Sequence, residues 1–376
     1  MNILLDKNIP CATELFKNIG DVKLVSGRSI ASSDLVAADA LIIRSITQVD
    51  EALLKNSNVK FVGTTTSGFD HIDIEWLTQS GIVFSAAPGC NAIAVVEYVL
   101  SSLLLLAERY CFDLREKLVG IIGVGHIGSR LNKSLKALGV NTILCDPPRE
   151  NSGDSSELFW PLEKLIHEAD ILTFHIPLNN KGLYKSYHLL NDELISIIRD
   201  RCILINTSRG SIFDNHALLK ALEKGKKLYT VLDVWENEPN ISLPLLAKVK
   251  IGTAHIAGYS LEGQIRASIQ VFVSYSKFLG QIRQVKLNDM LPIQTCNEIN
   301  FSGTLTQTNL KNLVHFMYNV SYDDVLLRNI IHVDKEFDNL RQLYPKRREW
   351  SSVKVNCYDP NISYILKVLG FNTNLI

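Results

Sequence analysis

Short apolar, β-branched runs alternate with helix-period segments along the first hundred residues of the chain. The runs predict strands at residues 2–5, 22–25, 40–43, 60–63 and 82–85, and the segments between them predict helices at residues 13–19, 50–56 and 73–80. Alternation of this kind is typical of a parallel sheet with helices on both faces. The chain therefore begins with an α/β domain.

A second series of strands follows a long helical segment at about residues 91–109. These strands are predicted at residues 119–122, 142–145, 171–174, 202–205 and 229–232, with helix-period stretches between them. We interpret them as a second doubly wound parallel sheet. The pattern then becomes helical from residue 257 to residue 280, and this return of the chain can complete the first domain.

Beyond residue 285 the alternation changes, which indicates a small α+β domain. Its strands are predicted near residues 297–301 and 353–357, and its helices near residues 310–319 and 362–369. The predicted fold is therefore α/β, with two Rossmann-like domains separated by a cleft and a smaller C-terminal domain. The predicted boundaries are 1–95 with 256–285 for the first domain, 96–255 for the second and 286–376 for the third.

The composition restricts the classes of partner. The 39 basic and 39 acidic residues give a net charge of zero, so no overall field attracts nucleic acid or an anionic membrane, and we expect neither as a partner. The seven cysteines form no CxxC pair, which favours reduced thiols in the cytoplasm. We expect no signal peptide, and the longest apolar run is too short to span a bilayer.

A glycine-rich turn begins the second domain. Gly123, Gly125 and Gly128 form G-x-G-x-x-G directly after a predicted strand and before a helical pattern, which is the context that binds a dinucleotide pyrophosphate. Asp146 follows the next strand, where a carboxylate accepts hydrogen bonds from the ribose hydroxyls. Its charge repels a 2′-phosphate, so the turn predicts NAD rather than NADP. Arg149, three residues further on, argues in the other direction.

Three later segments each place a reactive residue just after a predicted strand of the same sheet. They are INTSRGS with Arg209, LDVWENEP with Asp233 and Glu238, and GTAHIAGY with His255. Dehydrogenation of a secondary alcohol requires a base, and an imidazole titrates near neutral pH. A carboxylate beside it fixes the tautomer, and we assign that role to Glu238. Arg209 can bind a substrate carboxylate through two parallel hydrogen bonds.

Each of these segments also has an ordinary alternative interpretation. A single histidine at a strand end is more often a hydrogen-bonded structural residue, an SRG segment is usually a turn, and ENEP can be a charged loop. Their order after a cofactor motif favours the catalytic interpretation. The cluster Asp70-His71-Ile72-Asp73 offers metal ligands, but helix capping by Asp70 or Asp73 explains it better, and we expect no metal.

These motifs in this order resemble the D-isomer-specific 2-hydroxyacid dehydrogenases, and the resemblance extends from Met1 to about Phe371. It implies that Arg209, Glu238 and His255 are catalytic. It also implies substrate contacts from Ser45, Thr66 and Tyr259. For NAD it implies the glycine turn with the backbone at His126 and Ile127, together with Asp146, Ile176, Thr207, Ser208, Asp233 and Gly258. Two positions depart from the family pattern, because Ala254 replaces a proline and Ile176 replaces a threonine.

Within the family, segments such as CDPPR and RREWSS are similar to members that oxidise 4-phospho-D-erythronate with NAD in vitamin B6 biosynthesis. The resemblance therefore implies a small phosphorylated hydroxyacid as substrate. It also implies a homodimer formed by the C-terminal domain, although that domain could instead be a regulatory unit. Arg44 is the best-placed cation for the phosphate, and the Lys346-Arg347-Arg348 cluster is either a second candidate or a solvated charge run. The alternatives are another substrate such as 3-phosphoglycerate, or a dinucleotide-sensing module with little turnover.

Overall fold

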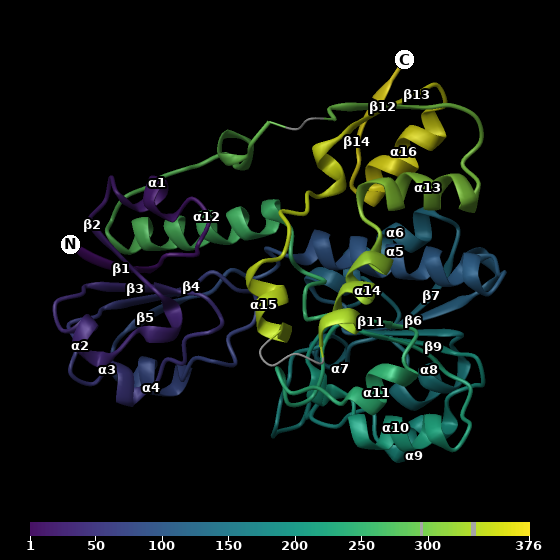
Figure 1. Cartoon of the computed structure of the whole chain (residues 1–376), viewed down its shortest axis with the longest axis horizontal. Coiled ribbons are helices and arrows are strands. Elements are labelled where there is room, and N and C mark those ends of the chain that lie inside the picture. The colour runs from purple at the N-terminus through teal and green to yellow at the C-terminus, as the bar shows by residue number, and fades with distance from the viewer. Residues whose placement is uncertain (294–295, 332–335) are drawn as a thin grey trace. The chain divides into compact units, whose positions relative to one another are not determined.

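The computed structural model of the chain describes residues 1–293, 296–331 and 336–376 (Figure 1). The chain divides into two compact units. One consists of Met1–Asn91 with Ser260–Ile293, and the other of Ala92–Tyr259 with Gln294–Ile376. Among the described residues, no helix combines the length and the apolarity that crossing a bilayer requires.

The first unit contains a five-stranded parallel sheet in the order β2-β1-β3-β4-β5. The strands are β1 Asn2–Asp6, β2 Asp21–Val25, β3 Ala40–Ile43, β4 Phe61–Thr64 and β5 Val83–Ser85. The helices are α1 Ala12–Phe16, α2 Ser32–Leu35, α3 Glu51–Leu54, α4 Ile74–Gln79 and α12 Leu261–Phe278. The return of the chain into this unit through α12 agrees with the predicted helical pattern after residue 257.

Alternate residues of these strands enter different cores, as the two-residue period of a strand requires. Ile3 and Leu5 of β1 share a core with Phe272 of α12, whereas Leu4 shares a second core with Leu54 of α3. Each face of the sheet is thus covered by helices. This arrangement confirms the doubly wound interpretation of the first hundred residues.

The second unit contains a six-stranded parallel sheet in the order β11-β10-β9-β8-β6-β7. Its strands are β6 Leu118–Ile122, β7 Asn141–Cys145, β8 Ile171–Phe174, β9 Ile203–Asn206, β10 Tyr229–Leu232 and β11 Ile251–Gly252. A single bridge from Phe159 to Leu144 of β7 extends the edge. The strand order reverses between β6 and β8, and a doubly wound sheet binds ligands outside the carboxyl ends of its strands at such a reversal.

Helices cover both faces of this second sheet. They are α5 Ala92–Arg109, α6 His126–Ala137, α7 Pro147–Asn151, α8 Leu162–Glu168, α9 Asp192–Ile197, α10 Asn215–Glu223 and α11 Leu243–Lys248. Val119 and Ile121 of β6 share a core with α5 and α6, whereas Ile122 shares another core with α8 and α9. The long predicted helix at 91–109 is α5, and most of its side chains are buried.

The C-terminal segment adds a three-stranded parallel sheet in the order β12-β13-β14. The strands are β12 Glu298–Phe301, β13 Lys354–Cys357 and β14 Asn372–Leu375, and the helices are α13 Gln307–Met317, α14 Val320–Ile330, α15 Glu336–Gln342 and α16 Pro360–Leu369. The sequence pattern predicted two of these strands and not β14, because the polar sequence NTNL carries no apolar alternation.

This C-terminal segment packs on α5 and α6 of the second unit (Figure 1). Leu313 of α13 and Leu366 of α16 lie in the same apolar core as Leu103 of α5. The compact units therefore group the segment with the six-stranded sheet. The division of the chain into three domains stays a prediction.

Arg347 shows how closely this segment is joined to the rest of the unit. It is buried, its guanidinium carbon lies 4.0 Å from the centre of the Tyr318 ring, and its Nη2 donates to the carbonyls of Ala94 and Ala257 at 2.7 and 3.0 Å. The interpretation of residues 346–348 as a solvated charge run is therefore wrong for Arg347. Its buried contacts tie the segment to α5 and to the loop after β11.

Candidate active site

Three neighbouring parallel strands place the predicted catalytic residues at one edge of the second sheet. β9, β10 and β11 are adjacent and run in the same direction, so their carboxyl ends lie together. Arg209 follows β9, Glu238 lies in the loop after β10, and His255 follows β11. The sheet topology thus accounts for the grouping of residues that lie far apart in the sequence.

His255 and Glu238 form a hydrogen-bonded pair. The Nδ1 atom of His255 lies 2.7 Å from Oε2 of Glu238, and the other carboxylate oxygen accepts the backbone N–H of Trp235 at 2.9 Å. A carboxylate at Nδ1 favours the proton on that nitrogen, which gives Nε2 the lone pair. This is the arrangement of a general base with an orienting carboxylate.

The electrostatics of the pair favour an ionised Glu238. Burial raises the pKa of this carboxyl group, but the charge and hydrogen bond of His255, the Trp235 N–H and the charge of Arg341 outweigh it, so the pKa lies below its ordinary value. Glu238 therefore carries its negative charge at neutral pH. An ionised partner stabilises the imidazolium that forms when His255 accepts a proton.

Asp233 holds the loop that carries His255. Its buried carboxylate accepts hydrogen bonds from the Thr253 hydroxyl at 2.6 Å and from the N–H groups of Ile256 and Ala257 at 2.8 and 3.0 Å. The N–H of His255 also donates to the Asp233 carbonyl at 2.7 Å. These bonds maintain His255 in the left-handed backbone region, at φ 57. A contact between Asp233 and NAD stays a prediction.

Arg209 lies in a loop that packs tightly against the loop of Glu238. A β-carbon at Gly210 would overlap the backbone of Trp235 and Glu236, so glycine is needed for this close approach. The Asn206 amide donates to the Arg209 carbonyl at 3.0 Å, and the guanidinium Nη1 donates to the Ser208 carbonyl at 2.8 Å. These contacts fix the conformation of the loop.

The glycine turn has the three features that a pyrophosphate site needs. Gly123 has φ +87, and a β-carbon there would collide with the carbonyl of His175 after β8. A β-carbon at Gly128 would collide with the carbonyl of Gly123, whereas one at Gly125 would meet no atom within 4 Å. Gly123 thus permits the tight turn, Gly128 permits the close packing of α6, and Gly125 leaves the approach open for a pyrophosphate. The residues fit a dinucleotide.

The separate roles of Gly128 and Gly125 predict different effects when each is replaced by alanine. Gly128→Ala should lower the free energy of unfolding by about 1–3 kcal/mol, because the new methyl group enters a packed contact. Gly125→Ala should leave that free energy within about 0.5 kcal/mol of the parent value and raise the Kd of NADH about tenfold, because the methyl group occupies the approach to the turn. Urea denaturation and NADH fluorescence titration measure the two quantities. Equal destabilisation by both variants would contradict the assignment.

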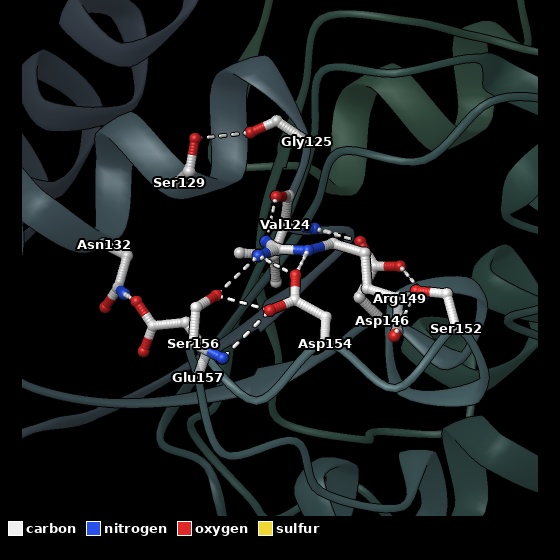
Figure 2. A network of polar contacts seen from close by, with 10 residues as sticks. All are labelled: Val124, Gly125, Ser129, Asn132, Asp146, Arg149, Ser152, Asp154, Ser156 and Glu157. Atoms are coloured by element: carbon white, nitrogen blue, oxygen red, sulfur yellow. Dashed lines mark hydrogen bonds and ion pairs between the residues drawn. The ribbon is translucent and has the colours of Figure 1, made fainter.

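Asp146 and Arg149 are held in a polar network beside the turn (Figure 2). One oxygen of Asp146 accepts the N–H of Val124 at 2.7 Å, and the other accepts the N–H of Arg149 at 3.2 Å. The guanidinium of Arg149 donates to Asp154 at 2.8 and 2.6 Å. The hydrogen bonds of Ser156 and then of Arg149 lower the pKa of Asp154 to about 2. Arg149 therefore has an anionic partner within the protein, which weakens the argument for a 2′-phosphate.

His175 is a residue of the reversal point that the sequence reasoning did not select. Its ring lies 2.9 Å from the Thr173 hydroxyl and 3.3 Å from that of Thr207, and burial lowers its pKa to about 3. It is therefore neutral at physiological pH. Its position before Ile176 in the sequence HIP, directly after β8, is the signal that could have identified it.

The remaining predicted cofactor residues are distributed along the same edge. His126 and Ile127 begin α6, directly after its N-cap Gly125. Ile176 lies beside Gly123, and the Ser208 hydroxyl donates to the Phe174 carbonyl. Thr207 follows β9, whereas Gly258 and the predicted substrate residue Tyr259 follow the His255 loop. All of them belong to the second compact unit.

Three predicted substrate residues belong to the other compact unit. Arg44 and Ser45 follow β3 and Thr66 follows β4, so they lie at the carboxyl edge of the five-stranded sheet. The Nε atom of Arg44 forms a 2.9 Å ion pair with the buried Asp6. The Thr66 hydroxyl lies 2.7 Å from that of Thr64 and donates to the Gly68 carbonyl. Arg44 thus has a carboxylate partner that fixes its direction.

Two clusters bear on metal binding. Asp73 caps α4 by accepting the N–H of Trp76 at 3.0 Å, which confirms the helix-capping interpretation. The structure also brings together His188, Asp214 and Glu236, a group that the sequence did not reveal. Each ring nitrogen of His188 faces one of the two carboxylates. We interpret this group as a polar link between loops.

Comparison with protein families identifies two regions. Residues 106–257 match the NAD binding domain of the D-isomer specific 2-hydroxyacid dehydrogenases. Residues 290–370 match a domain of unknown function, DUF3410. The first match contains the glycine turn and the three candidate catalytic residues, and the second contains most of the C-terminal segment.

Curated relatives match the whole chain. The erythronate-4-phosphate dehydrogenase of Serratia proteamaculans (strain 568) is 58% identical over 99% of this chain and 100% of its own. That of Yersinia pestis (strain Pestoides F) is 56% identical over the full length of both chains.

Solved structures match about three quarters of the chain. A D-lactate dehydrogenase from Aquifex aeolicus, complexed with NAD and lactic acid, has a TM-score of 0.61 at 23% identity and covers 74% of this chain and 96% of its own. An NAD+-bound 3-phosphoglycerate dehydrogenase of Entamoeba histolytica has a TM-score of 0.64 at 22% identity and covers 74% of this chain and 95% of its own. At these identities the likeness concerns the fold.

Proposed function

The chain belongs to the D-isomer-specific 2-hydroxyacid dehydrogenase family, and we propose that Arg209, Glu238 and His255 perform its reaction. It is an NAD-dependent enzyme that oxidises 4-phospho-D-erythronate to (R)-3-hydroxy-2-oxo-4-phosphooxybutanoate in vitamin B6 biosynthesis. The observation that carries the catalytic assignment is the 2.7 Å contact between His255 and Glu238, at the sheet edge that also holds the glycine turn.

The proton of the substrate 2-hydroxyl goes to His255. The Nε2 atom accepts this proton while Glu238 at Nδ1 stabilises the positive charge that develops on the ring. NAD, when it is bound at the glycine turn, supplies the acceptor for the hydride that leaves C2. In the reverse direction the same imidazolium returns the proton to the oxygen of the 2-oxo acid.

The carboxylate of the substrate requires a cation at a fixed position. Arg209 has a planar guanidinium that can donate two parallel hydrogen bonds to a carboxylate, and its loop is held by Asn206 and by the close packing at Gly210. The same guanidinium can polarise the oxygen that becomes the carbonyl. We assign substrate orientation and this polarisation to Arg209.

The other proposed contacts concern the rest of the substrate and the assembly. We propose that Ser45, Thr66 and Tyr259 contact the substrate and that Arg44 contacts its phosphate, with residues 1–95 and 256–285 forming the substrate-binding domain. We further propose a homodimer formed through residues 286–376, and a cytoplasmic location. The described cysteines are all free thiols, which supports a reducing environment.

A comparison of substrates tests the function. Initial rates of NADH formation should give a kcat/KM for 4-phospho-D-erythronate that is roughly 100-fold or more above those for 3-phosphoglycerate and for unphosphorylated D-erythronate, because the binding energy of the phosphate contributes to transition-state stabilisation. A higher value for 3-phosphoglycerate would overturn the substrate assignment. NADH binding without turnover of any hydroxyacid in the set would favour a dinucleotide-sensing role.

A further inference from the structure

The C-terminal segment reaches the catalytic loops through a series of side chains spaced along one stretch of sequence. Phe337 of α15 is buried in the same apolar core as Trp235 and Ala254, which flank Glu238 and His255 in the sequence. Further along, the rings of Tyr344 and Tyr259 meet edge to face at 5.8 Å. α15 is thus fixed on the second unit at the loops that carry the catalytic pair.

Arg341 lies between these two anchor points. It is four residues after Phe337 and therefore on the same face of α15. Its guanidinium carbon lies 5.9 Å from the centre of the Tyr259 ring, and its charge acts on both Tyr259 and Glu238. Among the described residues, its buried Nε atom has no hydrogen-bond partner. A partly buried cation thus lies over Tyr259, and its charge acts on the catalytic carboxylate.

We propose that Arg341 is a positioning residue for the dehydrogenation, which holds Tyr259 in place after the catalytic loop and adds a positive charge near the catalytic pair. This inference rests on the proposed function of the His255 and Glu238 pair. It assigns to the C-terminal segment a part in the chemistry as well as its proposed part in assembly. Arg341 acts through Glu238 and Tyr259 rather than on the reacting atoms.

The similarity to solved structures supports an added role for this segment. The matched lactate and phosphoglycerate dehydrogenases each cover 74% of this chain and nearly all of their own, so about a quarter of this chain has no counterpart in either. Residues 290–370, which include Arg341, match a family model separate from that of the NAD binding domain. The catalytic pair here therefore has a cationic neighbour from outside that domain.

The direction of the electrostatic effect follows from the charges around the pair. Two charged or titratable side chains act on Glu238, namely His255 in the loop after β11 and Arg341 on α15. Arg341 in turn interacts with Tyr259, Glu238 and Asp338. A positive charge beside the pair opposes the uptake of a proton by it. Loss of that charge should therefore make the pair easier to protonate, and the active form, with neutral His255, should be lost at a higher pH.

The test is the pH profile of kcat/KM for three variants of the full-length enzyme. In Arg341→Met the acid limb should move upward by about one pH unit, with a fall in kcat/KM of about tenfold at pH values within that limb. Arg341→Lys keeps the charge, so its acid limb should stay near that of the parent enzyme. Arg328→Gln removes a guanidinium from α14, where Arg328 pairs with Asp324, and should not move the limb.

Each outcome separates this inference from its alternatives. An unmoved limb in Arg341→Met, with or without a higher KM, would overturn the positioning role, and a higher KM alone would indicate a substrate contact instead. Equal shifts in Arg341→Met and Arg341→Lys would also overturn it. Far-ultraviolet circular dichroism and NADH titration establish that each variant is folded. An inactive parent enzyme would instead contradict the proposed function, which keeps the two failures distinguishable.

Discussion

Replacing His255 by Asn is expected to lower kcat about 10³-fold while the Kd of NADH stays within about twofold of the parent value. The base acts on the proton of the substrate hydroxyl, so its loss affects the chemical step. The glycine turn that fits the cofactor is formed by other residues, namely Gly123, Gly125 and Gly128. Steady-state rates and NADH fluorescence titration measure the two quantities separately.

Asparagine is the appropriate substitute because His255 has a positive backbone φ of 57. Asparagine tolerates the left-handed region better than alanine does, so His255→Asn removes the imidazole with little added backbone strain. His255→Ala removes the imidazole and also adds backbone strain, so this variant should have a lower melting temperature as well. A control is His216→Asn, which removes an exposed histidine on α10 and should leave kcat unchanged.

The pH dependence of the residual activity provides a second measurement. The pKa of Glu238 lies below its ordinary value. Protonation of the hydrogen-bonded pair of His255 and Glu238 removes the base, so the pH profile of the parent enzyme should have an acid limb that belongs to the pair. The His255→Asn variant should therefore lose that limb. Equal losses of NADH binding and turnover, or an acid limb that persists unchanged, would contradict the role of His255 as the base.

Residues that follow strands were the part of the site that the sequence could predict. The apolar runs at residues 202–205 and 229–232 identified β9 and β10, and a parallel sheet brings the ends of such strands to one edge. The two-residue strand β11 before His255 was not among the predicted strand ranges. The glycine spacing also predicted the turn, because each glycine is required by the backbone conformation or packing at its own position. In these cases a few adjacent residues contain all the information that fixes the position.

Contacts between distant segments could not be predicted in this way. Arg341 and Arg347 lie far along the chain from His255, and no periodic pattern relates them to its loop. Arg347 stands in a run of three basic residues that looks solvated, yet it is buried against Tyr318. The strand β14 was missed because burial by α16 and pairing with β13, rather than local apolar alternation, define it. Tertiary packing determines all three features.

Replacing Arg209 by Lys is expected to lower kcat/KM about 100-fold, with both a higher KM and a lower kcat. Lysine keeps the charge but offers a point cation, which cannot reproduce two parallel hydrogen bonds to a carboxylate. Arg209→Lys removes the bond from the guanidinium to the Ser208 carbonyl. The loop should still keep its conformation, because Asn206 bonds to the backbone carbonyl of residue 209 and the close approach of Gly210 to Trp235 does not involve the Arg209 side chain. NADH binding should therefore change little.

A substrate analogue makes this prediction specific to the carboxylate. The parent enzyme and Arg209→Lys should differ much less on 4-phospho-D-erythronamide than on the acid, because the amide cannot accept the charged, forked interaction in either enzyme. Arg199→Lys serves as the matched control, since Arg199 interacts with Asp170 before β8 at the opposite edge of the sheet. If the penalty of Arg209→Lys were the same on acid and amide, Arg209 would be supporting the loop. A penalty confined to the acid would establish the guanidinium as the group that orients the substrate for proton transfer to His255.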